Sequence, residues 1–105
     1  MGIIGDPDGG VIVEEEEEVS TTNYPMWKVI MHNDPVTTMD FVVGILRDVF
    51  QKEGKTAVKI MMEIHETGSG LAGVYMKEHA EMRIDTTHSL ARTQGFPLKC
   101  TLEKA

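Results

Sequence analysis

The sequence contains one cysteine, one tryptophan and no long apolar run. A single cysteine cannot form an internal disulfide, which agrees with a reducing compartment. No segment approaches the roughly eighteen apolar residues of a membrane span, and the N-terminus lacks the basic flank and apolar centre of a signal peptide. We therefore expect a cytoplasmic protein without a membrane segment. Its 105 residues, 41% of them hydrophobic, suffice for one domain with a modest core.

Positive charge is missing from the first quarter of the chain. Residues 1–26 contain Asp6, Asp8 and five consecutive glutamates at 14–18 but no lysine or arginine, so they carry the whole net charge of −7. Such a segment repels itself and buries little apolar surface, which predicts a disordered acidic N-terminal extension. The folded domain is expected at 27–105, where acids and bases balance. No basic patch follows from this composition, so we expect no nucleic-acid partner.

The hydrophobic periodicity from Trp27 onward predicts a small α+β domain. We expect a strand, two helices, a strand, a helix and a strand, at residues 27–32, 38–51, 56–67, 71–76, 77–94 and 97–103. Thr37 and Asp40 have the spacing of a capping box for the first helix, and Gly54 is a suitable residue to end it. The order β-α-α-β-α-β predicts three helices packed on a small three-stranded antiparallel sheet.

A polar cluster separates the first strand from the first helix, in the stretch HNDPVTTMDF at 32–41. Asn33 and Asp34 supply an amide and a carboxylate there. Further along, Met39, Val42 and Ile45 share one side of the first predicted helix, and Met61, Ile64 and His65 share one side of the second. If these two sides face each other, they enclose an apolar pocket with an amide, a carboxylate and an imidazole at its mouth.

Enzymatic and metal-binding functions find little support in the sequence. Of the four histidines, at 32, 65, 79 and 88, no pair has the i, i+4 spacing of a helical zinc site, so we expect neither metal nor cofactor. Cys100 alternates with Leu98 and Leu102, as expected for a buried strand residue. A small hydrolase that uses Cys100 or His65 stays open as a third option, although no orienting group or oxyanion site is visible.

Four segments resemble the ClpS adaptor family and follow one another in the family's order, from about Trp27 to Ala105. They read HNDPVTTMDFVVGILRDVF, IMMEIHETG, AGVYMKEHAE and FPLKCTLEKA. The resemblance implies a non-catalytic adaptor. Such an adaptor binds a bulky hydrophobic first residue of other proteins (Leu, Phe, Tyr or Trp) and delivers these proteins to a Clp ATPase for degradation.

The resemblance also assigns roles to residues of this chain. Asn33 and His65 would contact the substrate's α-ammonium group, and Asp34 would add negative potential. The residues implied around the substrate side chain are Thr37, Met39, Val42, Ile45, Met61, Ile64 and Leu98. Glu78 and Arg83 would dock a monomeric adaptor on the N-terminal domain of a ClpA- or ClpC-type ATPase.

At Pro35 the chain departs from the family's pattern. Family members often have a second aspartate where this chain has Pro35, which removes a possible water-mediated contact but fixes the loop backbone. The β-α-α-β-α-β order also resembles the C-terminal domain of the ribosomal stalk protein. A non-catalytic interaction module of that type is therefore the alternative, although it would not need Asn33, Asp34 and His65 together.

Overall fold

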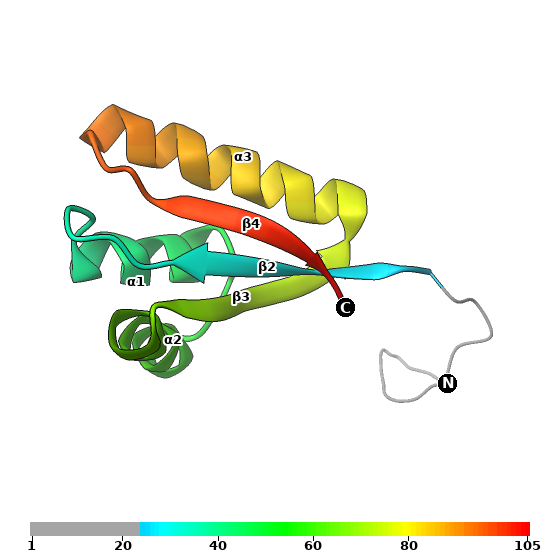
Figure 1. The fold of residues 1–105 in the computed structure, drawn as a ribbon, viewed down its shortest axis with the longest axis horizontal. Coiled ribbons are helices and arrows are strands. Elements are labelled where there is room, and N and C mark those ends of the chain that lie inside the picture. Colours follow the sequence, from blue (N-terminus) through cyan, green and yellow to red (C-terminus); the bar gives the residue numbers. More distant parts are fainter. Residues whose placement is uncertain (1–23) are drawn as a thin grey trace.

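The computed structural model describes residues 24–105, and residues 1–23, which make up most of the predicted acidic extension, lie outside this part (Figure 1). The elements follow the predicted order β-α-α-β-α-β. Their bounds are β2 Met26–His32, α1 Met39–Asp48, α2 Gly54–Thr67, β3 Ser69–Met76, α3 Lys77–Gln94 and β4 Lys99–Lys104. The predicted fold class is therefore confirmed.

Strand β2 lies in the centre of the antiparallel sheet, whose order is β3-β2-β4. Met31 of β2 is opposite Gly70 of β3 and Cys100 of β4. In Figure 1 the sheet lies in front of α1, with α3 along β4 and α2 below β3. On the opposite face of the sheet, Met26 and its partner Met76 are exposed. The helices thus cover one face only, and the core forms between that face and the helices.

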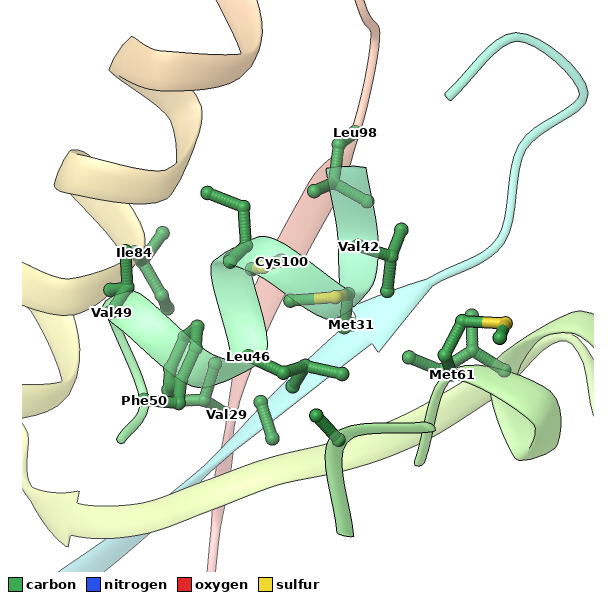
Figure 2. Packing of buried hydrophobic residues seen from close by; sticks show 14 of the residues in the cluster. Val29, Met31, Val42, Leu46, Val49, Phe50, Met61, Ile84, Leu98 and Cys100 are labelled. Atoms are coloured by element: carbon green, nitrogen blue, oxygen red, sulfur yellow. The ribbon is translucent and has the colours of Figure 1, made fainter. Parts of the chain in front are cut away.

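The core joins β2 to α1. Val29, Met31 and Leu46 are completely buried. Figure 2 shows Leu46 of α1, and Phe50 just after this helix, beside these strand residues, with Cys100 of β4 close by. Full burial of such a side chain contributes about 1.5–3 kcal/mol to the free energy of unfolding, so this layer fixes α1 against the sheet. On α3, four residues at helical spacing are buried: Ala80, Ile84, Thr87 and Ala91.

The predicted limits of α1 were partly wrong. The N-cap is Thr38 and not Thr37, because the Thr38 hydroxyl oxygen accepts a hydrogen bond from the N–H of Phe41 at 3.1 Å. At the other end α1 stops before Gln51, which adopts a left-handed conformation with φ 56°. Gly54 does not end this helix but begins α2.

Two glycines at the end of α2 set the approach of this helix to the sheet. Gly68 is its left-handed C-cap, with φ 99°. Strand β3 begins at the next residue, Ser69, and contains Gly70. A Cβ atom on Gly70 would lie 2.7 Å from Cγ1 of Ile64, so only glycine allows α2 to pack this closely on β3.

Candidate functional site

A pocket of about 350 Å³ opens where the β2–α1 loop meets α1 and the last turns of α2. It therefore combines one loop and two helices. Its lining residues are Asn33, Asp34, Pro35, Val36, Thr37, Thr38, Met39, Val42, Met61, Ile64 and His65.

The apolar part of the pocket comes from facing sides of α1 and α2. Val42, Met61 and Ile64 line it and are no more than 9% exposed. Figure 2 shows Met61 of α2 beside Val42 of α1. Met39, one helical turn before Val42, lines the pocket but is 43% exposed, so it lies at the rim. These sides of the two helices therefore face each other across the pocket, an arrangement that the sequence left open.

The loop that forms the polar side is organised by Asp34. Its carboxylate accepts hydrogen bonds from the N–H of Val36 at 2.8 Å, the N–H of Thr37 at 2.7 Å and the hydroxyl of Thr37 at 2.6 Å. This closed turn explains why Thr37 does not cap α1, since its hydroxyl is engaged by Asp34. Pro35 additionally fixes the backbone φ within the turn.

Burial raises the pKa of Asp34, whereas the hydrogen bonds from Thr37 and Val36 lower it, and the net pKa lies below the ordinary value of 3.8. Asp34 is therefore a carboxylate at neutral pH. Because its oxygens are satisfied within the loop, it contributes negative charge to the pocket and holds the loop in shape.

Asn33 and His65 are brought to the same end of the pocket by a backbone contact. The N–H of Asn33 donates a hydrogen bond to the carbonyl oxygen of Gly68 at 2.9 Å, which joins the end of β2 to the end of α2. His65 lies in the last turn of that helix. Both residues are exposed, and within residues 24–105 no hydrogen bond engages either side chain. Their acceptor atoms can therefore serve a ligand.

The comparisons with known proteins agree on one family. The family model described as "ATP-dependent Clp protease adaptor protein ClpS" matches residues 22–101. The chain belongs to the ClpS family. The ClpS adapter protein of Desulfatibacillum aliphaticivorans is 48% identical over 95 residues, which cover 90% of this chain and 89% of the relative. That of Desulforapulum autotrophicum is 54% identical over 80 residues, 76% of this chain and 77% of the relative.

A solved structure of the same family has a similar fold. The structure of Agrobacterium tumefaciens ClpS2 bound to L-phenylalaninamide matches with a TM-score of 0.76 at 31% identity, covering 79% of this chain and 100% of the other. Together with the family match, this identifies the chain as a Clp protease adaptor and not as a ribosomal stalk module. Within residues 24–105, none of the helices has the length and apolar character to cross a membrane.

Not every residue implied by the ClpS resemblance lines the pocket. Ile45 and Leu98 are only 4% and 5% exposed, belong to the core and are not among the lining residues. Conversely, Pro35, Val36 and Thr38 line the pocket and were missed by the sequence analysis. The loop sequence offered one signal for them, since a proline two residues after Asn33 turns the chain back toward the helix.

The two residues implied in ATPase docking lie in different environments on α3. Glu78 is exposed in the first turn. Arg83 is half-buried: its Nη1 donates a hydrogen bond to the carbonyl oxygen of Val49, and its guanidinium lies 4.6 Å from the centre of the Tyr75 ring. Arg83 therefore ties α3 to the end of α1 and to β3.

Cys100 is a buried strand residue, as predicted. Burial raises the pKa of its thiol to about 12, so it is protonated at neutral pH, the opposite of what a nucleophile requires. Its N–H donates a hydrogen bond to Nε2 of His88 at 3.0 Å, which covers the outer edge of β4. These contacts give Cys100 a structural role, in agreement with an adaptor family.

Proposed function

We propose that this ClpS-family chain recognises the first residue of other proteins and delivers these proteins to a Clp ATPase. The recognised group is a free α-ammonium on a residue with a bulky hydrophobic side chain: Leu, Phe, Tyr or Trp. One observation carries the proposal: a single pocket combines the buried apolar residues Val42, Met61 and Ile64 with Asn33, Asp34 and His65.

The polar side of the pocket suits an α-ammonium group. Such a group has a positive charge and three donors, whereas the amide of an internal residue has one donor and no charge. The Asn33 carbonyl oxygen and a neutral His65 ring nitrogen would accept from it, and the Asp34 carboxylate would stabilise its charge. Each charge-assisted hydrogen bond contributes about 1.5–3 kcal/mol, enough to distinguish a free N-terminus from an internal residue.

The apolar side suits one large side chain. A volume of about 350 Å³ is close to the lower end of the ~300–1,000 Å³ typical of small-molecule pockets, so it accommodates a ligand of about one residue. Burial of a Leu or Phe side chain contributes about 1.5–3 kcal/mol. L-phenylalaninamide, the ligand of the similar Agrobacterium ClpS2, has the required features: a free α-ammonium, a benzyl side chain and no carboxylate.

Delivery would use surfaces outside the pocket. We assign docking on the ATPase N-terminal domain to the region of Glu78 on α3, with Arg83 holding this helix in place. The acidic extension at 1–26 would act during hand-over of the substrate, while 27–105 binds it. At about 3.3–3.6 Å per residue, an extended 26-residue segment can reach about 90 Å, far beyond the pocket.

The test is degradation of a reporter protein by a Clp ATPase and its peptidase, with and without this chain. A reporter that begins with Leu should be degraded faster when the full chain is present, whereas a reporter that begins with Ser should not. A chain starting at Tyr24 should bind the Leu reporter equally well but fail to accelerate its degradation. Equal acceleration of both reporters would refute recognition of the first residue, and normal delivery by the shortened chain would refute the hand-over role.

A further inference from the structure

Two apolar loop residues, Pro35 and Val36, form one edge of the pocket mouth, which we name the lip. Both line the pocket. Val36 is 55% exposed, compared with 43% for Met39 and at most 9% for the buried lining residues Val42, Met61 and Ile64. A lining side chain with more than half of its surface in solvent lies at the opening. The lip therefore borders the route by which a bound chain leaves the pocket.

The lip is held in a fixed position. The N–H of Val36 donates a hydrogen bond to the Asp34 carboxylate at 2.8 Å, and the next residue, Thr37, donates two more to the same group. Pro35 has a restricted φ. A surface that is already ordered loses little conformational entropy when it binds, so even a small apolar contact can contribute to affinity.

The position of the first residue determines what can reach the lip. If its side chain lies on Val42, Met61 and Ile64 and its ammonium is near Asn33, the rest of the substrate must pass through the mouth. Consecutive Cα atoms are about 3.8 Å apart, so the second residue is still at the mouth. An extended chain points successive side chains in opposite directions, which leaves the second side chain on the outer side of the pocket, where Val36 is exposed.

From this arrangement we infer that the lip contacts the side chain of the substrate's second residue and favours an apolar one there. The inference rests on the proposed function, because it needs the first residue in the pocket. Pro35 and Val36 carry no charge and no side-chain hydrogen-bonding group. A Leu at the second position therefore removes apolar surface of both partners from water, whereas a Ser does not.

The experiment compares two peptides that differ only at the second position, Leu-Leu and Leu-Ser, each with a free N-terminus. Their dissociation constants are measured by calorimetry with the full chain. We expect the Leu-Leu peptide to bind about fivefold more tightly. In Val36→Ser this ratio should fall to about one. In Val36→Thr, which keeps the shape of the side chain and adds a hydroxyl, it should fall part of the way.

A matched control is Val58→Ser on α2, because Val58 is 46% exposed and lies outside the pocket lining. This variant should keep the full ratio. Equal dissociation constants of the two peptides with the unmodified chain would overturn the inference. Equal loss of affinity for both peptides in Val36→Ser would also overturn it, because Val36 would then contact the first residue. The acetylated Leu-Leu peptide separates the two proposals: if it binds as tightly as the free peptide, the proposed function itself fails.

Discussion

The backbone N–H of Asn33 donates a hydrogen bond of 2.9 Å to the carbonyl oxygen of Gly68. This bond joins two helix-flanking segments that are far apart in the sequence, and it holds the side chains of Asn33 and His65 at one end of the pocket. The bond uses only main-chain atoms. No hydrogen bond within residues 24–105 engages the Asn33 amide, so this group can bind a ligand while the backbone of the same residue maintains the site.

We predict that Asn33→Ala abolishes most ligand binding without unfolding the protein. Alanine keeps the main-chain bond to Gly68 but removes the acceptor. Affinity for a Leu-initiated peptide should fall roughly tenfold to hundredfold, the value of one charge-assisted hydrogen bond. The midpoint of thermal unfolding should change little. A large loss of thermal stability would show that the Asn33 side chain is needed for the fold and not for the ligand.

Much of the fold could be predicted from the sequence because its signals were local. The bounds of α3 follow from an amphipathic run that ends at Gly95 with Pro97 beyond it, and both signals act on the backbone directly. Thr37 and Thr38, in contrast, are chemically equal candidates for the cap of α1. Thr38 is the cap because the hydroxyl of Thr37 donates its hydrogen bond to Asp34. This hydrogen bond depends on the conformation of the loop, which the sequence does not show.

The candidate site could be predicted in part from the sequence. Helical spacing identified which sides of α1 and α2 meet, but not how deep each residue lies. Ile45 therefore seemed equivalent to Val42, although both belong to the core and only Val42 lines the pocket. Arg83 has no partner visible in the sequence, because Val49 and Tyr75 reach it only through the packing of α1 and β3 on α3.

Met39 at the rim should select against β-branched first residues. A flexible thioether can cover an unbranched or aromatic side chain, whereas Val or Ile places bulk at Cβ, where the thioether would lie. Met39→Ala should therefore narrow the difference in affinity between Leu- and Ile-initiated peptides, measured by competition binding. If the affinity for all peptides falls by the same factor, Met39 is part of the pocket wall and does not select between first residues.

We expect substitution of Arg83 to lower the stability of the fold and substitution of Glu78 to impair delivery to the ATPase. Arg83→Met removes the bond to the Val49 carbonyl and the contact with Tyr75, so it should lower the free energy of unfolding by about 1–3 kcal/mol in denaturant titrations. Glu78→Ala, on the exposed first turn of the same helix, should leave stability unchanged and slow degradation of a Leu reporter. Unchanged stability in Arg83→Met would contradict the role we assign to this side chain.

Acid should loosen the β2–α1 loop through Asp34. Because the pKa of Asp34 is below its ordinary value of 3.8 in the folded state, its contribution to stability is present above that value and is lost as pH falls through the lower, folded pKa. In Asp34→Asn this part of the pH dependence should disappear. The measurement is the midpoint of thermal unfolding from about pH 5 to pH 2, compared between the two proteins. Parallel profiles would exclude Asp34 as a source of acid sensitivity.

The proposed pocket ligand is a free α-ammonium group next to a bulky apolar side chain. Binding of L-phenylalaninamide and of its N-acetyl derivative to the full chain, measured by NMR and calorimetry, tests this directly. We expect the free amine to bind and to shift the signals of Asn33, Met61 and His65, whereas the acetylated compound, with the same side chain and no ammonium, should bind at least about tenfold more weakly. Equal affinity of the two compounds, or shifts confined to residues outside the pocket, would contradict this proposal.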